Sequence, residues 1–289
     1  MAIDEIQVSD ADAGPYGIVV GPDRALWFTL VHRGAVGRLG DGGEVTVYPL
    51  DPADGGPTVI AAGPDEALWF TEFKGDRIGR IGTDGAISAF PVPGAGPYGI
   101  AAGADGALWF TAMRTDRIGR ITTDGTVTGY DLPVKGGMPS MIAAGADDGL
   151  WFTLNQGNAI GRIGLDGEIV IHPLPTEGAA PVGITAAGDG AMWFVEIGAG
   201  QIGRIEPDGK IEEFPLPDRA AKPHAIVSGP GGGCYFTEWG ANRVGWITGY
   251  GVVEEYDLPT AGSEPHGITI GPDGAVWTAL EIGALARIA

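Results

Sequence analysis

Three residues near the C-terminal end of the chain could do chemistry together: Glu264, His266 and Glu281. Glu264 and His266 are two positions apart, and in a β-strand this spacing puts both side chains on one side. Carboxylate oxygens suit hard divalent cations, and an imidazole can accept a proton near neutral pH. We therefore expect a metal site beside a base. Mg²⁺ is favoured over zinc as the metal, because neither thiolates nor a histidine cluster are offered.

A plainer interpretation stays open for the two acids. The chain has 37 acidic and 17 basic residues, a formal net charge of −20. Glu264 and Glu281 could simply be solvated acids on the rim of a very acidic protein. Their place in an internal repeat favours function, because Glu264, His266 and Glu281 all fall in one copy of it.

The repeat is marked by an aromatic residue that follows a glycine-rich turn. The spacing between successive copies is 42 residues, and once 40. A period of this length indicates a solenoid, a propeller or an array. The seven aromatic residues are Trp27, Trp69, Trp109, Trp151, Trp193, Tyr235 and Trp277.

Each copy contains four short apolar or alternating stretches separated by turn signals. In the second copy, Gly63-Pro64-Asp65-Glu66 and Asp84-Gly85 are such signals, and Asp-Gly between apolar stretches is typical of a tight hairpin. No segment has a sustained helical period. The sequence therefore predicts an all-β fold, a seven-bladed β-propeller with four antiparallel strands per blade, formed by residues 1–289 as a single domain.

The two ends of the chain indicate how the ring closes. Ile288 finishes the third strand of the last copy, and no fourth strand follows it. The missing strand is expected at residues 3–8, which resemble the fourth strand at residues 211–216. Pairing between the termini would complete the last blade and leave no open edge at the seam.

Most repeated residues are expected to serve the scaffold. The tryptophans should pack between blades. The Gly-Arg pair that recurs at Gly37-Arg38 and its equivalents should tie neighbouring blades together, with anion binding by a ring of arginines as the alternative. The single cysteine, Cys234, falls where a small apolar residue is expected, and we predict an inert buried thiol.

Composition narrows the classes of partner. The negative charge repels phosphate backbones, which argues against nucleic acid or an anionic membrane as partner. No apolar run approaches the roughly 20 residues that span a bilayer, and no secretory signal is visible. The expectation is a cytoplasmic protein, and a monomer because a closed propeller has no edge that demands a partner.

Three repeat positions should meet on one face of the ring, where the first strand of each blade starts and the second ends. There they form an apolar and aromatic bowl, with polarity concentrated in the last two blades and His224 among the polar groups. Such a concave site is typical of a small-molecule pocket. The bowl is predicted to contain Tyr16, Phe73, Tyr98, Met113, Ile197 and Trp239.

Other polar residues have weaker signals. His32 follows the second strand of the first blade on the same face, and His172 falls on an outer strand, where it should face solvent. Three further acids end second strands: Glu72, Glu196 and Glu238. We expect them to point into the interface between blades and to pair with the repeat arginines.

With these motifs in view, the chain resembles the virginiamycin B lyase family, also called streptogramin B lyases, over its whole length. The specific part is the segment Glu264-Pro265-His266-Gly267, together with Glu281 and His224. The Trp-Phe-Thr motif of the blades is shared with many non-catalytic propellers.

The resemblance implies an enzyme that linearises cyclic hexadepsipeptide antibiotics by elimination, not hydrolysis. It implies that His266 is the general base, that Glu264 and Glu281 bind Mg²⁺, and that His224 binds substrate. The expected partner is a small cyclic depsipeptide. Tyr16 lies beside the last blade across the seam, and it is predicted to line the pocket with Trp239.

Two other classes stay open from the sequence. One is a metal-dependent hydrolytic lactonase, although such enzymes typically have six blades and gather Asp, Asn and Glu around Ca²⁺. The other is a non-catalytic propeller that binds peptide or glycan on its top face, with Glu264, His266 and Glu281 as ligand contacts only.

Overall fold

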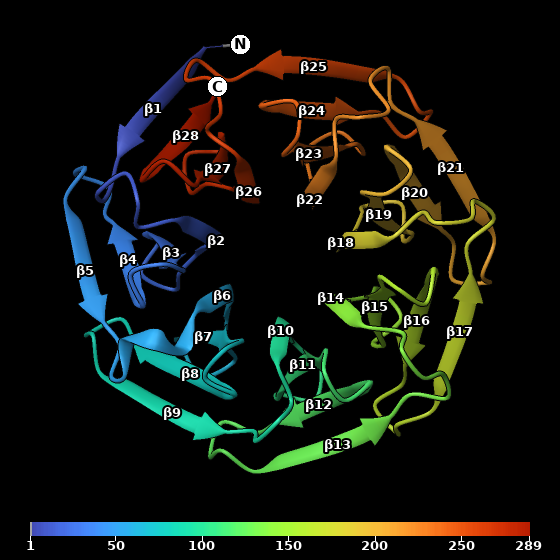
Figure 1. Ribbon diagram of the computed structural model, residues 1–289, viewed down its shortest axis with the longest axis horizontal. Helices are drawn as coiled ribbons and strands as arrows, with labels where there is room; N and C mark the ends of the chain where they lie inside the picture. The colour runs from blue at the N-terminus through green and yellow to red at the C-terminus, as the bar shows by residue number, and fades with distance from the viewer. Residues whose placement is uncertain (1) are drawn as a thin grey trace.

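The structure, a computed structural model, describes residues 2–289. These residues form seven four-stranded antiparallel sheets, arranged as blades around a central axis (Figure 1). One short 3₁₀ helix, η1 (Ala53–Gly55), is the only helix among the described residues. The prediction of an all-β, seven-bladed propeller is confirmed.

Each blade contributes one strand to each of four concentric positions. The innermost strands are β2 (Pro15–Val20), β6 (Pro57–Ala62), β10 (Pro97–Ala102), β14 (Pro139–Ala144), β18 (Pro181–Ala186), β22 (Pro223–Ser228) and β26 (Pro265–Ile270). The second strands are β3 (Leu26–Leu30), β7 (Ala67–Glu72), β11 (Leu108–Ala112), β15 (Leu150–Leu154), β19 (Met192–Glu196), β23 (Cys234–Glu238) and β27 (Val276–Leu280).

The outer half of each blade follows the same order. The third strands are β4 (Ala35–Leu39), β8 (Arg77–Gly82), β12 (Arg117–Ile121), β16 (Ala159–Ile163), β20 (Gln201–Ile205), β24 (Arg243–Ile247) and β28 (Ala284–Ile288). The outermost strands are β5 (Val45–Pro49), β9 (Ile87–Pro91), β13 (Val127–Asp131), β17 (Ile169–Pro173), β21 (Ile211–Pro215), β25 (Val253–Asp257) and β1 (Ile3–Gln7).

The N-terminal strand completes the last blade, as predicted. The strand order of blade seven is β1-β28-β27-β26, and β1 pairs with β28 from Ile3↔Ile288 to Gln7↔Ala284. The two ends of the chain lie side by side in Figure 1. This pairing satisfies the outer edge of β28 and closes the ring.

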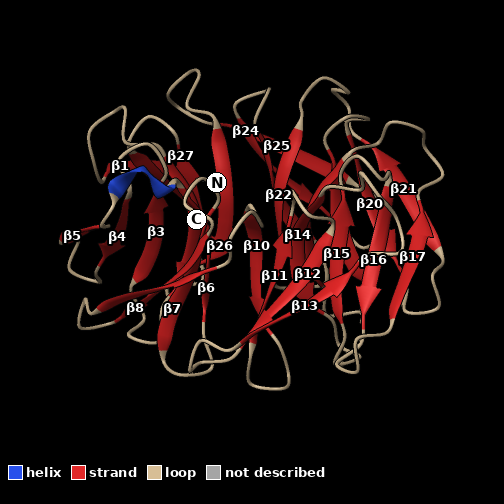
Figure 2. Ribbon diagram, turned by 60° about the horizontal axis from the view of Figure 1, so that its bottom comes forward, coloured by secondary structure: helices blue, strands red, loops and turns tan. Residues whose placement is uncertain are grey.

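The antiparallel order fixes which residues share a face of the ring. Figure 2 shows that the strands run between the two faces, with loops at both ends. Pro265, at the start of β26, pairs with Leu280, at the end of β27. Residues just before β26 and just after β27 therefore lie together on one face, and the β26–β27 turn lies on the other.

The cores between blades are apolar, as the sequence predicts. Trp27 of blade one is fully buried, in a cluster with Ile60, Leu68 and Phe70 of blade two. Cys234 is also fully buried, and burial raises the pKa of its thiol to about 12. The predictions of tryptophans packed between blades and of a buried cysteine are confirmed.

The prediction that the Gly-Arg pair ties neighbouring blades is wrong. Arg38 Nε donates to Asp23 Oδ2 at 2.8 Å, and Trp27 Nε1 donates to Asp23 Oδ1 at 2.9 Å, so all three residues belong to blade one. The repeated aspartate of the β2–β3 turn is the nearest carboxylate to the third strand of its own blade. These contacts therefore hold one blade together.

Threonines on the second strands make the links between blades. Thr29 Oγ1 donates to the carbonyl oxygen of Thr58 in the next blade at 2.6 Å. In the same way, Thr237 Oγ1 of blade six donates to the carbonyl oxygen of His266 in blade seven at 3.0 Å. The innermost strand of blade seven is thus anchored from its neighbour.

The three acids that end second strands are buried, but they do not pair with the repeat arginines as predicted. Glu72 accepts a hydrogen bond from Arg77 at the start of β8. Glu196 accepts one from Gln201 Nε2 at 2.6 Å, and its other oxygen is buried without a hydrogen-bond partner among the described residues. In blades two and five the repeat arginine is already bound by the aspartate of its own blade, so Glu72 and Glu196 each bind the residue opposite them in the sheet. Glu238 is also buried, but neither of its carboxylate oxygens has a hydrogen-bond partner among the described residues.

This difference predicts how folding stability depends on pH. Burial raises the pKa of Glu196 from 4.5 to about 8. A carboxyl whose pKa rises on folding holds its proton more tightly in the folded state, so stability falls as pH rises from about 4.5 to about 8. Glu196→Gln should raise the free energy of unfolding at pH 8 by about 1–3 kcal/mol and flatten this dependence, as measured by urea unfolding.

The equivalent glutamate of blade two is the matched control. Glu72→Gln removes the charge that neutralises the buried side of Arg77, and it should lower stability at pH 8. Equal effects of the two substitutions, or a steeper pH dependence in Glu196→Gln, would contradict this account of the buried acids.

Candidate functional site

The structure brings Glu264, His266 and Glu281 together on one face of blade seven. Each offers one ligand atom, and these atoms all lie within 4.8 Å of one another. We predicted that Glu264 and His266 point the same way because both lie in one strand, and this is only partly correct. His266 is in β26, but β26 starts at Pro265, and Glu264 has a left-handed backbone with φ 50°. The carboxylate reaches the cluster from the turn before the strand.

The left-handed position is shared by every blade. In the first three blades it is occupied by Gly14, Gly56 and Gly96, with φ values from 56° to 64°. A side chain at such an angle is strained, and strained residues concentrate at functional sites. Glu264 is therefore an acidic residue at a position where the backbone conformation favours glycine.

Blade one packs closely against His266. A Cβ atom on Gly267 would lie 2.5 Å from the carbonyl oxygen of Tyr16, so glycine lets β26 approach β2 at this point. The ring centroids of Tyr16 and His266 lie 4.4 Å apart, with the planes tilted by 32°. His266 is 7% exposed, so its ring is enclosed on most sides.

Glu281 is the hub of the polar contacts. Its Oε2 lies 3.3 Å from His266 Nε2, and its Oε1 lies 2.7 Å from His32 Nε2. The hydrogen bond with His266 is the main cause that holds the pKa of Glu281 well below its ordinary value. The nearby Glu281 carboxylate is in turn the main cause that raises the pKa of Glu264. Two carboxylates this close favour a bound cation or a shared proton.

His32 had only a weak signal in the sequence, and the structure places it in the cluster. His32 follows β3 of blade one and reaches across the seam to Glu281, although half of its side chain remains exposed. Closure of the ring makes blade one the neighbour of blade seven. This adjacency of blades one and seven was the signal from which a contact between His32 and Glu281 could have been predicted.

A second group of contacts crosses the axis of the ring. The hydroxyl groups of Tyr16 and Tyr98 are hydrogen-bonded, and the Tyr16 hydroxyl also lies 3.2 Å from His224 Nε2. Burial lowers the pKa of His224 to about 3, so this imidazole is neutral at pH 7. Tyr16 and Tyr98 also line an axial cavity of about 170 Å³, together with His224 and Met141.

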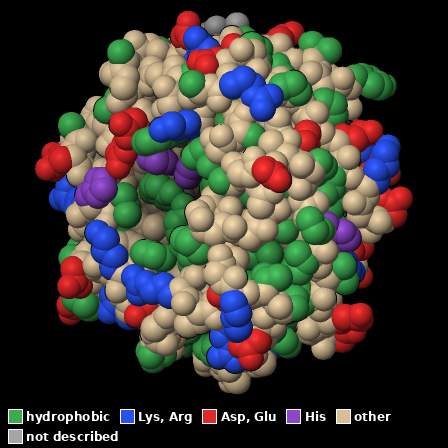
Figure 3. All heavy atoms as spheres, turned by 45° about the vertical axis from the view of Figure 1, so that its right-hand side comes forward, with side chains coloured by type: hydrophobic (Ala, Val, Ile, Leu, Met, Phe, Trp, Pro, Cys, Tyr) green, Lys and Arg blue, Asp and Glu red, His purple; other side chains and the backbone are tan. Residues whose placement is uncertain are grey.

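Trp239 lies beside the acids. Its Nε1 donates to Glu264 Oε2 at 3.3 Å, and Lys222 Nζ lies 4.8 Å from the ring centroid. On the other side of the axis, Arg114 lies 4.5 Å over the ring of Phe73. Neither of these contacts between a cation and an aromatic ring was predicted from the sequence. Figure 3 shows histidine side chains beside a hollow, next to acidic side chains.

His172 differs from its prediction. Its ring stacks on Trp151 at a centroid distance of 5.8 Å and is only partly exposed, whereas we expected it to face solvent. Burial lowers the pKa of this histidine. His172 belongs to β17 in blade four, remote from the blade-seven cluster.

The donor set fits a hard divalent cation. Glu264 and Glu281 supply two carboxylates at the mouth of the bowl, and neither is bound to an arginine or a lysine among the described residues. Oxygen ligands of this kind suit Mg²⁺ or Mn²⁺. His266 could complete the set, or it could remain free beside the cation as a base.

The geometry at Glu264 predicts a conflict between stability and function. Glu264→Gly should raise the free energy of unfolding by roughly 1 kcal/mol in metal-free buffer, because it relieves the left-handed strain and removes a carboxylate next to Glu281. The measurement is urea or thermal unfolding in the presence of a chelator.

Met138→Gly is the matched control, since Met138 has the same φ of 50° at the same repeat position in blade four. It tests the backbone strain alone, so its gain in stability should be smaller than that of Glu264→Gly. A loss of stability in Glu264→Gly but not in Met138→Gly would show that the acid stabilises the metal-free fold.

Solved structures of known proteins share the fold of this chain over nearly its whole length. A solved streptogramin B lyase structure superimposes with a TM-score of 0.96 at 43% identity, covering 99% of this chain and 96% of that chain. A catalytically inactive histidine-to-alanine variant of virginiamycin B lyase from Staphylococcus aureus, solved with quinupristin, has a TM-score of 0.96 at 41% identity, covering 99% and 98%.

Curated relatives match strongly over a shorter segment. Virginiamycin B lyase from Streptomyces coelicolor is 64% identical over 50 residues, which span 17% of each chain. The sequence profile of the Virginiamycin B lyase family, in contrast, matches residues 1–288. The predicted resemblance is thereby confirmed: the chain belongs to the virginiamycin B lyase family.

Proposed function

We propose that the protein is a carbon–oxygen lyase that linearises cyclic streptogramin B depsipeptides by elimination and so confers resistance to them. The observation that carries the proposal is the cluster of Glu264, His266 and Glu281, whose ligand atoms lie within 4.8 Å of one another. The sequence of this chain is also 41% identical to that of a virginiamycin B lyase solved with quinupristin. That relative is inactive after a single histidine is replaced by alanine.

Glu264 and Glu281 are the proposed metal ligands, and Mg²⁺ is the proposed ion. When bound there, a divalent cation supplies positive charge for a carbonyl oxygen of the substrate. The hydrogen bond with His266 lowers the pKa of Glu281, and the Glu281 carboxylate in turn raises the pKa of Glu264. Two carboxylates this close repel each other when both are charged, which supports a position between them for the cation. His32 holds the second oxygen of Glu281 and orients that carboxylate.

His266 is the proposed base. Its Nδ1 is buried, and its Nε2 faces the cluster, 3.3 Å from Glu281 Oε2, so Nε2 is the nitrogen that a substrate in the bowl would meet. The Tyr16 ring lies against the imidazole, and Thr237 binds the carbonyl oxygen of the same residue. A ring enclosed in this way is held in one orientation, which favours proton transfer along a fixed direction.

The proposed reaction breaks one carbon–oxygen bond without water. His266 removes the proton on the α-carbon of the residue whose side-chain oxygen forms the ester. The electron pair left on the α-carbon forms a double bond to the β-carbon, and the bond from the β-carbon to the ester oxygen breaks. The ester leaves as a carboxylate, and the ring opens to a linear isomer with a conjugated alkene.

Tyr16, His224 and Trp239 are the proposed substrate-binding residues. Their aromatic rings border the cluster, and a macrocycle rich in apolar and aromatic groups needs such a surface. The neutral imidazole of His224 can hydrogen-bond a peptide group and adds no positive charge beside the cation. We further propose that residues 1–289 act as one domain and as a monomer in the cytoplasm. In residues 2–289, no helix is long and apolar enough to span a membrane.

Product mass tests the reaction directly. We expect incubation with virginiamycin S or quinupristin to give a product of unchanged mass with new ultraviolet absorbance. A product heavier by one water would indicate a hydrolytic lactonase instead. Binding without any product would indicate a non-catalytic propeller.

Substitution of the base should abolish turnover. His266→Ala is expected to lower kcat by at least about 10²–10⁴-fold while leaving the thermal unfolding midpoint close to that of the wild type. His172→Ala is the control, because its ring packs in blade four and should affect stability without affecting chemistry. Wild-type rates in His266→Ala would remove this residue as the base.

Metal dependence tests the two acids. Glu281→Gln should shift the Mg²⁺ concentration at half-maximal activity upward by more than about tenfold, since one charged ligand is lost. A chelator should abolish the wild-type reaction, and added Mg²⁺ should restore it. An unchanged Mg²⁺ titration in Glu281→Gln would count against its role as a ligand.

A further inference from the structure

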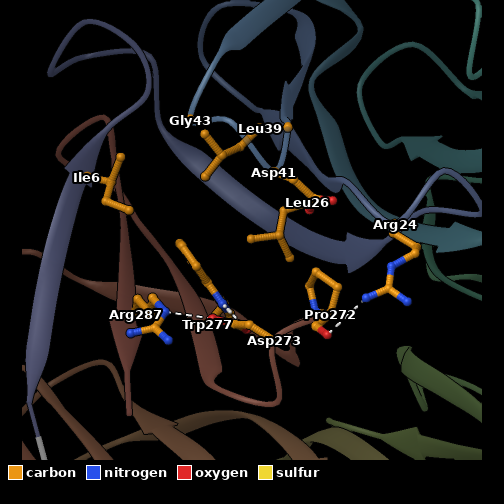
Figure 4. A pocket seen from close by; sticks show the side chains of 11 residues that line it. Ile6, Arg24, Leu26, Leu39, Asp41, Gly43, Pro272, Asp273, Trp277 and Arg287 are labelled. Carbon is orange, nitrogen blue, oxygen red and sulfur yellow. Dashed lines mark hydrogen bonds and ion pairs between the residues drawn. The ribbon is translucent and has the colours of Figure 1, made fainter.

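A cavity of about 270 Å³ lies at the seam between blades seven and one, on the face opposite the catalytic cluster. Turns of both blades border it, including the β26–β27 turn at Pro272 and Asp273. We call it the seam slot; its apolar walls are Ile6, Leu26, Leu39 and Trp277 (Figure 4).

The other blades explain why the slot is open. In each of blades one to five, a ring on the outermost strand stacks on the tryptophan of the second strand. The centroid distances are 5.4–5.8 Å, and the planes are within 12–19° of parallel. These pairs are Trp27–Tyr48, Trp69–Phe90, Trp109–Tyr130, Trp151–His172 and Trp193–Phe214.

Blade seven has Ile6 at this position. Ile6 pairs with Leu285 in the same register in which Tyr48 pairs with Val36. An aliphatic side chain cannot cover the indole as a flat ring does. Trp277 is accordingly 7% exposed, whereas Trp27 is fully buried.

The glycine of the neighbouring turn gives an independent sign of the missing ring. A Cβ atom on Gly85 would lie 2.5 Å from the Tyr48 ring, so the ring of blade one occupies the space above that turn. Gly43 is the equivalent glycine beside blade seven, and a Cβ atom there would meet nothing within 4 Å. The space that a ring fills elsewhere is therefore empty next to Trp277.

We infer that the seam slot is a second binding site, which takes the planar aromatic ring of a small molecule. The ring would lie parallel to Trp277, as the protein's own rings lie on their tryptophans. The mouth is polar: Arg24 Nη2 donates to the Pro272 carbonyl oxygen at 3.4 Å, and Arg287 Nε donates to Asp273 at 2.6 Å (Figure 4). A hydroxyl or ring N–H can therefore be hydrogen-bonded at the edge.

Indole and phenol are the probes, with cyclohexanol as the non-aromatic control. Calorimetry and ¹H–¹⁵N NMR should show one site for each aromatic probe, with Kd on the order of 1 mM. Cyclohexanol should bind at least about tenfold more weakly, because it cannot stack. This readout does not depend on turnover, so it can fail while the proposed lyase activity stands, and the reverse.

Two substitutions exchange the slot between blades. Ile6→Phe restores the missing ring, and it should abolish probe binding at this site and raise Tm by roughly 2–4 °C. Tyr48→Ile is the matched variant: it should open an equivalent slot between Trp27 and Gly85, lower Tm and raise the number of probe sites from one to two.

The outcomes separate the possibilities. Binding that is lost in Ile6→Phe and doubled in Tyr48→Ile supports the slot. Probe binding that persists unchanged in Ile6→Phe would place the ring elsewhere, in the bowl for example, and would overturn the inference. Absence of binding to the folded wild type at 10-fold above the expected Kd would also overturn it, as would equal binding of cyclohexanol and phenol.

Discussion

The antiparallel pairing of β26 with β27 is the constraint on which the site depends. Pro265 pairs with Leu280, so the residue before one strand and the residue after the other meet at one end of blade seven. Glu264 and Glu281 are these two residues. Backbone hydrogen bonds of the sheet thus hold two carboxylates close together against their repulsion, and His266, at the second position of β26, lies beside them.

Ring closure makes this arrangement a property of three blades and not of one. Because β1 completes blade seven, blade one becomes its neighbour and supplies Tyr16 and His32 to the cluster. Blade six anchors β26 from the other side through Thr237. An open array of the same repeats would lack the contacts from blade one, so the closing strand on the outside of the ring supports the arrangement of side chains near its axis.

Blade seven departs from the repeat in its packing as well as in its polar residues. In blade one, Phe28 fills the space above Gly37, where a Cβ atom would lie 2.2 Å from the ring. Blade seven has Thr278 and Ala286 at these paired positions, so threonine replaces the larger phenylalanine and alanine replaces the smaller glycine. Ile6 in place of a stacked ring is a third departure, and it leaves the seam slot on the opposite face.

The fold could be read from the sequence because each blade repeats the same local signals. Seven copies of a turn, an aromatic residue and a hairpin determine the strand count, and the missing fourth strand determines the closure. The details of polar pairing were less accessible. The partner of Arg38 depends on which carboxylate lies nearest in three dimensions. That carboxylate is Asp23, in a turn of the same blade, and not an acid of the next blade.

The site shows the same limit. The convergence of Glu264, His266 and Glu281 followed from strand order, but the left-handed backbone at Glu264 has no signal in a single copy. It emerges only when Glu264 is aligned with Gly14, Gly56 and Gly96. His32 reaches Glu281 from blade one, at the other end of the sequence, and His224 of blade six contacts the Tyr16 hydroxyl, so both contacts depend on side-chain orientations that the repeat pattern does not specify.

We propose that the two carboxylates of blade seven hold a cation beside the imidazole of His266. Anomalous diffraction from crystals soaked in Mn²⁺ tests this most directly, because the anomalous signal of the ion is much stronger than that of the protein atoms and so locates the ion. We expect one strong peak bridged by Glu264 and Glu281, with His266 Nε2 facing the bowl. A peak at another place, or none at saturating Mn²⁺, would contradict it.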